Sequence, residues 1–304
     1  MSQESFPSRV RVVEVGPRDG LQNEPTPVPV EARIALIEAL ADSGLTRIEC
    51  GSFVSPRWVP QMAGTEDVFA KLNRISGVRY SALVPNIQGI AKAAECKADE
   101  VAVFVSASEA FSRANLNCSI EESLRRSEEV VRAACKLDIP VRGYISCVMG
   151  CPFAGEVLAT DVVSLTEALL RMGCYEISLG DTIGVGTPLQ VQHTLDEVGR
   201  RVPVEKLAVH FHDTWGQALA NVFAALELGI AVVDSAVAGL GGCPYAPGAS
   251  GNLATEDLLY MLNGMQIETG IDIERVAAAG SSIGKVIGKQ ANSKVAKAMQ
   301  SSKS

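Results

Sequence analysis

The sequence predicts an α/β protein folded as a (β/α)8 TIM barrel with an extra C-terminal helical segment. Short runs rich in β-branched residues alternate with helical stretches along the chain, which is the pattern of parallel βα units. Eight such runs occur, and the 304 residues exceed the roughly 250 that this barrel typically needs. A doubly wound open sheet is the alternative, but only the barrel closes without leaving an edge strand.

The signals for individual elements follow the chain. Ser119 and Glu122 form a capping-box pattern ahead of a helix predicted over residues 124–137, and Pro188 after Thr187 marks a first helical position. Gly44, Gly173 and Gly229 follow apolar helical patterns and can serve as C-caps. The predicted strands cover residues 10–15, 47–50, 79–84, 100–105, 141–147, 175–179, 207–212 and 232–236.

The chain is expected to form one domain over residues 1–304. Residues 10–270 would form the barrel, and residues 271–304 would form a C-terminal helix and a flexible tail. Residues 285–304 are rich in Lys, Ser and Ala, so we expect this tail to be loosely packed or to cover one end of the barrel.

Composition excludes several classes of partner. A net charge of −8 and a pI near 5.1 argue against nucleic acid, which needs a clustered basic face. No run of about 18 apolar residues occurs, so no membrane partner is expected. The first residues resemble neither a signal peptide nor a transit peptide, which favours a cytoplasmic protein with reduced thiols. Cys147 and Cys151 are four residues apart, but without a second pair at suitable spacing they are more typical of buried small hydrophobes than of zinc ligands.

The strand predicted over residues 207–212 carries a His-x-His pair. Alternate residues of a strand share a face, so His210 and His212 stand side by side and can ligate one metal ion. The Asp19 carboxylate and the Asn252 amide oxygen would complete a mixed set of four ligands. Such a set suits Mg²⁺ or Mn²⁺ with about two positions left for water or substrate, although Co²⁺ or Zn²⁺ would also bind. The metal could act as a Lewis acid on a chelated substrate hydroxyl and carbonyl.

Active sites of such barrels lie at the carboxyl ends of the strands, where further polar residues occur. Arg18 could stabilise an oxyanion, or could form a structural ion pair with Glu49 or Asp19. Glu49 could orient Arg18, and Asp181 is either an inward carboxylate or the cap of the following turn. The expected substrate contacts besides Arg18 are Gln22, Ser52 and Tyr144.

Residues 239–252 contain five glycines and two prolines, without a helical or strand period. Such a stretch can be a mobile lid, and Cys243 near its centre could act as an acid or base, whereas a buried thiol would be inert. Its glycine spacing does not match the phosphate-binding loops of the Walker or Rossmann type.

Three motifs together resemble the 3-hydroxy-3-methylglutaryl-CoA lyase family. They are GPRDGLQNE at residues 16–24, HFHD at residues 210–213, and GLGGCP at residues 239–244 with Gly251-Asn252. The similarity runs from about residue 10 to about residue 270. It implies cleavage of 3-hydroxy-3-methylglutaryl-CoA to acetyl-CoA and acetoacetate by an enzyme that binds an acyl-CoA thioester and forms a homodimer.

The resemblance also implies roles for individual residues. Asp19, His210, His212 and Asn252 would hold a divalent cation, usually Mg²⁺ or Mn²⁺. Asp19, a histidine or a hydroxide on the metal would remove the substrate proton, and the group that protonates the leaving enolate is open. The expected catalytic residues are Arg18, which would stabilise the enolate, Glu49, which would support the site, the loop cysteine Cys243, and Asp181 and His210.

One departure and three alternatives accompany this resemblance. Some members carry a cysteine near the C-terminus that forms an intersubunit disulfide, but the last cysteine here is Cys243. The nearest alternative is a lyase for a longer 3-hydroxyglutaryl-CoA. A synthase of the isopropylmalate or citramalate type is disfavoured, because about 30 residues after the barrel leave no room for the usual regulatory domain. A barrel that binds acyl-CoA without turnover is a further alternative, which metal-dependent cleavage would exclude.

Overall fold

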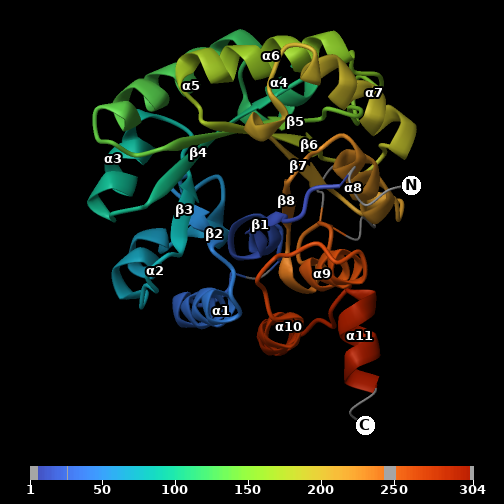
Figure 1. The fold of residues 1–304 in the computed structure, drawn as a ribbon. Coiled ribbons are helices and arrows are strands. Elements are labelled where there is room, and N and C mark those ends of the chain that lie inside the picture. Colours follow the sequence, from blue (N-terminus) through green and yellow to red (C-terminus); the bar gives the residue numbers. More distant parts are fainter. Residues whose placement is uncertain (1–5, 26, 243–250, 302–304) are drawn as a thin grey trace.

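The structure is a computed structural model that describes residues 6–25, 27–242 and 251–301. Eight parallel strands close into a barrel, each beside the next in sequence and β8 beside β1 (Figure 1). The predicted fold class is therefore confirmed, and the predicted strand ends differ from the observed ones by no more than two residues. The strands are β1 (Arg11–Glu14), β2 (Arg47–Ser52), β3 (Arg79–Leu83), β4 (Glu100–Ser106), β5 (Val141–Ser146), β6 (Glu176–Asp181), β7 (Leu207–Phe211) and β8 (Val232–Ser235).

Helices surround the strands in an outer ring (Figure 1). No helix in the described part of the chain is both long and apolar enough to cross a membrane. The α-helices are α1 (Val30–Asp42), α2 (Thr65–Lys71), α3 (Ile87–Glu95), α4 (Glu109–Leu116), α5 (Ile120–Cys135), α6 (Ala159–Met172), α7 (Pro188–Gly199), α8 (Ala218–Glu227), α9 (Thr255–Gly264), α10 (Ile273–Ile287) and α11 (Lys294–Ser301). The short helices are η2 (Gly16–Gly20), η3 (Pro60–Met62), η4 (Val204–Lys206) and η5 (Val237–Gly239).

The predicted capping residues lie at observed helix ends, although α5 covers Ile120–Cys135 and not residues 124–137. The Ser119 hydroxyl accepts a hydrogen bond from the Glu122 backbone N–H at the start of α5, and Pro188 is the first residue of α7. Gly44, Gly173 and Gly229 all have positive φ just after helices, a conformation that costs glycine little because it has no Cβ.

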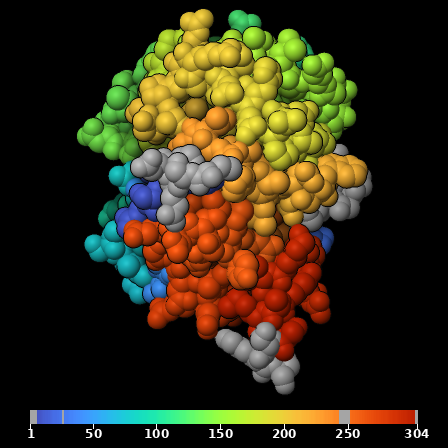
Figure 2. Space-filling view, turned by 45° about the vertical axis from the view of Figure 1, so that its right-hand side comes forward, coloured from blue at the N-terminus to red at the C-terminus, as the bar shows by residue number. Residues whose placement is uncertain are grey.

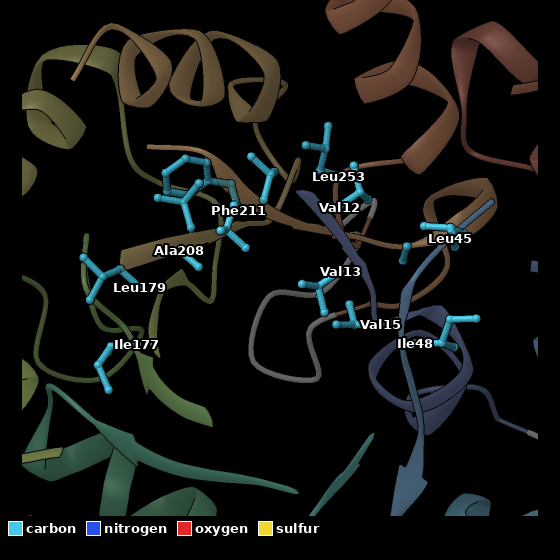
Figure 3. Close-up of a cluster of buried hydrophobic side chains, with 14 of the residues drawn as sticks. Val12, Val13, Val15, Leu45, Ile48, Ile177, Leu179, Ala208, Phe211 and Leu253 are labelled. Atoms are coloured by element: carbon cyan, nitrogen blue, oxygen red, sulfur yellow. The ribbon is translucent and has the colours of Figure 1, made fainter. Parts of the chain in front are cut away.

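The apolar core lies between the barrel and its helices. Val209 and Phe211 are buried on the outer face of β7, on the opposite side of the strand from His210. Figure 3 labels members of this cluster on three strands: Ala208 and Phe211 on β7, Val12 and Val13 on β1 with Val15 just after it, and Ile48 on β2. The barrel interior, in contrast, contains several charged side chains, and these lead to the site described below.

The C-terminal segment is more ordered than the sequence suggested. Residues 285–301 include the end of α10 and a second helix, α11, whereas the sequence predicted one C-terminal helix followed by a tail. Ser293 caps α11, since its hydroxyl accepts from Ala296 N–H, and it donates to the Asp257 carboxylate in α9 at 2.6 Å. Figure 2 shows α11 (red) against the orange body of the protein. Asn292 N–H donates to Ala238 O, so the segment before α11 packs on the turn after β8, as the alternative expectation of a cover at one end proposed.

Candidate active site

The carboxyl ends of the strands surround a cavity of about 760 Å³. It contains most of the residues that the sequence marked, and they come from four different parts of the barrel. This agreement follows from the parallel barrel, because all strands end at the same face. The predicted site residues that line the cavity are Arg18, Asp19, Gln22, Ser52, Tyr144, His210 and His212.

Asp19, His210 and His212 form a cluster that can hold a metal ion. One potential ligand atom from each residue lies within 4.8 Å of the others. Asp19 is held by η2, the turn after β1, and the histidines lie at the end of β7. Asn252 pairs with His212 through a strand-like bridge, and its side-chain N–H₂ donates to Asp19 Oδ2 at 2.9 Å and to Leu240 O at 3.0 Å.

The protonation states and unpaired atoms of these residues fit a divalent cation. Burial is the main cause that lowers the pKa of His212 to about 4, and the nearby His210 lowers it further. The His212 imidazole is therefore neutral at pH 7. Burial opposes ionisation of Asp19, but Arg18 and the two histidines lower its pKa to about 2. Asn252 Oδ1 and His212 Nδ1 are buried and have no hydrogen-bond partner. A divalent cation favours a carboxylate, a neutral imidazole and a free oxygen acceptor, and Asp19, His212 and Asn252 Oδ1 supply these three.

Arg18 lies directly beside this cluster. Its Nε donates to Glu49 Oε2 and its Nη1 donates to Asp19 Oδ1, both at 2.6 Å. Burial would lower the pKa of Arg18, but the two carboxylates raise it above its ordinary value, so its charge is permanent. Arg18 therefore forms the ion pairs with Glu49 and Asp19 and also lines the cavity, so the two interpretations of this residue are compatible. The hydrogen bond from Nε to Glu49 orients the guanidinium. Burial raises the pKa of Glu49 itself, whose Oε1 has no partner.

His210 is oriented by a network that the sequence analysis missed. Its Nδ1 lies 3.3 Å from Asp234 Oδ2, and Asp234 accepts two hydrogen bonds from Arg142 and one from Ser178. Burial alone would lower the pKa of His210, but the hydrogen bond to Asp234 raises it. If Nδ1 carries the proton, Nε2 is left free to ligate a metal. The available signal was an Asp within an apolar strand, at the position that pairs with His210.

Comparisons with known proteins bear on this arrangement. A model described as HMGL-like matches residues 9–283. The chain belongs to the HMGL-like family. It is 56% identical over 293 residues to the cytoplasmic 3-hydroxy-3-methylglutaryl-CoA lyase of Rattus norvegicus, covering 96% of this chain and 85% of that protein.

Two Pseudomonas aeruginosa comparisons extend this result. A 3-hydroxy-3-isohexenylglutaryl-CoA/hydroxy-methylglutaryl-CoA lyase is 55% identical over 295 residues, with 97% of this chain and 98% of that protein covered. The crystal structure of hydroxymethylglutaryl-CoA lyase from this organism superposes with a TM-score of 0.96 at 55% identity, covering 98% of this chain and 99% of the other. The resemblance that the motifs indicated is therefore confirmed over nearly the whole chain.

Three residues marked in this HMGL-like sequence are not members of the Asp19, His210 and His212 cluster. The Asp181 carboxylate accepts from the N–H groups of Val185 and Gly186, so it caps the following turn, as its alternative interpretation held. Cys147 and Cys151 are buried against Phe111, and the metal cluster found among the described residues does not include them. Cys243 lies outside the described residues, so its catalytic role stays a prediction.

Proposed function

We propose that this HMGL-like protein cleaves 3-hydroxy-3-methylglutaryl-CoA to acetyl-CoA and acetoacetate. The observation that carries the proposal is the permanent charge of Arg18 beside the Asp19, His210 and His212 cluster in one cavity. The cavity thus combines a cation site with a fixed positive charge, which are the two features that a retro-Claisen cleavage needs. The choice of an acyl-CoA substrate rests on the relatives, which are named as lyases of 3-hydroxyglutaryl-CoA thioesters.

We further propose Mg²⁺ or Mn²⁺ as the cofactor, held by Asp19, His210, His212 and Asn252. When bound, the ion would supply a Lewis acid that lowers the pKa of the substrate hydroxyl. Asp234 would keep the His210 ring in place. The bond from the Asn252 N–H₂ group to Asp19 would orient the Asn252 amide so that its own Oδ1 is available to the cation.

The bond changes assign a catalytic role to Arg18. Loss of the hydroxyl proton leads to a ketone, the bond between C2 and C3 breaks, and its electron pair moves into the thioester as an enolate. A proton then converts this enolate to acetyl-CoA. Arg18 would face more negative charge in the transition state than in the bound substrate, so its charge would accelerate the step. Tyr144, Ser52 and Gln22 line the same cavity and would contact the reacting acyl group.

The outer part of the cavity suits the coenzyme A portion of the substrate. Its lining includes Asn115 of α4, Asn117 just after this helix and Arg126 of α5. Trp58 adds an exposed aromatic surface to the lining. Amide groups, a guanidinium and an indole ring match the polar chain, phosphates and adenine of coenzyme A.

A second candidate substrate is a 3-hydroxyglutaryl-CoA with a longer alkyl group on C3. The relative that also carries the isohexenyl name is 55% identical, and the cavity has an apolar wall of Leu83, Phe104 and Tyr144 inside the barrel. Such a wall can pack against an alkyl chain. The rates of cleavage with alkyl groups of different length on C3 decide between the two substrates.

Acetyl-CoA release by the purified protein tests the proposal, with acetoacetate as the second product from 3-hydroxy-3-methylglutaryl-CoA and a longer 3-oxo acid from each longer homologue. We expect cleavage of 3-hydroxy-3-methylglutaryl-CoA with Mg²⁺ or Mn²⁺ and its loss after EDTA. Cleavage only of longer homologues would favour the second candidate, and no cleavage of either despite bound metal would reject both. The expected homodimer is a separate prediction for light scattering, and the cytoplasmic location stays a prediction for cell fractionation.

A further inference from the structure

Glu14 links the two chain segments that carry the site. It lies at the end of β1 and is fully buried. Its Oε1 accepts from Gly16 N–H at 2.8 Å and from Val237 N–H at 2.9 Å. Gly16 begins η2, which holds Arg18 and Asp19, whereas Val237 begins η5, which follows β8. One carboxylate oxygen therefore joins segments that are more than 200 residues apart in the sequence.

A second buried carboxylate holds the same turn. Both oxygens of Glu256 accept from Ala238 N–H, at 3.0 and 2.9 Å. Ala238 has φ +58°, a left-handed conformation that is unfavourable for alanine and needs support from its surroundings. Thr255, the neighbour of Glu256, donates from Oγ1 to Glu14 Oε2 at 2.7 Å. The two carboxylates thus form one hydrogen-bonded unit around η5.

The turn that they hold is bonded to the proposed ligand Asn252. The Leu240 carbonyl, which follows η5, accepts from the Asn252 side chain at 3.0 Å. Close packing reinforces this contact, since a Cβ on Gly241 would lie 2.7 Å from Asn252 Nδ2. A shift of η5 would therefore move the Leu240 carbonyl, which orients the Asn252 amide.

We propose that Glu14 and Glu256 are positioning residues that hold η2 and η5 in the relative placement in which Arg18, Asp19 and Asn252 share one site. Neither carboxylate forms an ion pair with a cation in the described residues. The charged groups that act on them are each other and Asp257, whose carboxylate caps α11. Two buried carboxylates without a cation are costly to the fold, and site assembly explains why they are present.

Exchange of backbone amides tests this inference without substrate or metal. We expect Glu14→Ala to increase hydrogen–deuterium exchange in peptides covering residues 14–20 and 236–242 by at least about 10-fold. Glu14→Gln should restore protection, because its amide oxygen can still accept from Gly16 and Val237 while its N–H₂ group donates to the Thr255 hydroxyl. If Glu14→Ala does not fold, Thr255→Val removes one bond to Glu14 with little change of shape.

Manganese affinity, measured by electron paramagnetic resonance, supplies the second readout. Outer residues that orient ligands typically change metal affinity by about 10- to 100-fold, and we expect this loss for Glu14→Ala and Glu256→Ala. The matched control is Glu100→Ala, which removes a buried carboxylate bonded to Tyr175 at the other end of the barrel. The control should keep both the amide protection and the affinity.

The results separate this inference from the proposed function on which it rests. Unchanged exchange and unchanged Mn²⁺ affinity in folded Glu14→Ala or Thr255→Val would overturn the inference, as would equal effects in Glu100→Ala. Failure to cleave any 3-hydroxyglutaryl thioester would reject the proposed function alone, because the exchange measurement involves neither substrate nor metal.

Discussion

Arg18 is held by structural contacts that also suit the catalytic role proposed for it. Its guanidinium lies between Glu49 and Asp19, and its carbon Cζ lies 5.8 Å from the centre of the Tyr144 ring. Three neighbours therefore fix its position before substrate arrives. A preorganised charge of this kind stabilises developing negative charge without reorganising during the reaction.

Removal of this guanidinium tests its role. We expect Arg18→Ala to lower kcat by at least about 10²-fold, by analogy with the loss of one oxyanion donor. Arg18→Lys should recover only part of the rate, because an ammonium cannot reproduce the planar contacts with Glu49 and Asp19. Saturation kinetics give kcat, and Arg132→Ala on the exposed face of α5 serves as the control. A fall in kcat of less than about 3-fold for Arg18→Ala would contradict the assignment.

Asp234 should act on the metal site through His210. We expect Asp234→Asn to weaken Mn²⁺ binding by about 10- to 100-fold, because the ring of His210 loses its charged partner. The control is Glu176→Gln, since Glu176 also binds Arg142 but does not contact His210 in the described network. Titration calorimetry compares the affinities, and equal losses in both variants would point to a general effect on the barrel interior.

Local spacing was sufficient to predict that Asp19, His210 and His212 belong to one possible metal site, but not which residues orient them. His210 and His212 lie on one strand, and Arg18 and Asp19 are adjacent, so each pair was visible within a short window of sequence. Asp234 meets Arg142 across 92 residues, and this contact follows only from the register of the closed barrel. Glu14 and Glu256 were missed for a related reason, because their partners are backbone N–H groups of a distant turn.

At the scale of elements, hydrophobic periodicity and capping residues predicted the strands and helices that pack against the core. The strands and the start of α7 carried clear signals, and Thr187 N–H donates to Gln190 at that start. Helix α11 was missed because its Lys-, Ser- and Ala-rich sequence matches that of a solvated tail. Its position depends on Asp257 of α9, which accepts from Ser293 and Val295, and such a contact between distant segments leaves no local pattern.

The elements around η5 should make stability depend on pH. Burial raises the pKa of Glu14 to about 7 and that of Glu256 to about 8, from an ordinary value of 4.5. The folded protein therefore binds these protons more tightly than the unfolded chain does. The stability that they contribute is complete below about pH 4.5 and is lost as the pH rises through 7 to 8, by up to about 1.4 kcal/mol per pH unit for each group.

Glu256→Gln should reduce this dependence, because its side chain stays neutral. We expect the fall in unfolding free energy between pH 5 and pH 9 to be smaller in the variant by on the order of 2 kcal/mol. Urea denaturation at a series of pH values measures it, with Glu268→Gln as the control because that carboxylate is exposed. An unchanged pH dependence would mean that Glu256 is already ionised at pH 5.

At the scale of the whole molecule, a network of buried charged groups runs through the barrel interior beside its apolar wall. Arg11 pairs with Glu176 near the amino-terminal end of the barrel, Glu176 pairs with Arg142, and Arg142 pairs with Asp234 beneath His210. The large apolar core packs around the strands and includes Val12, Ile48 and Phe211 (Figure 3). Removing one charged residue of this buried network leaves the charge of its partner uncompensated. The residues beneath His210 therefore also contribute to the stability of the barrel.

Metal binding should therefore raise the stability of the entire barrel. A ligand that binds only the folded state at 100 times its Kd contributes about 2.7 kcal/mol, which for a chain of this length corresponds to a rise in Tm on the order of 5 °C. We expect Mn²⁺ to produce this rise, EDTA to reverse it, and His212→Ala to show little of it, because that variant lacks one ligand while the Asp234 network stays intact. Differential scanning calorimetry without substrate measures all three. Equal shifts in the native chain and in His212→Ala would place the bound metal elsewhere on the surface and would remove the basis for assigning the Asp19, His210 and His212 cluster.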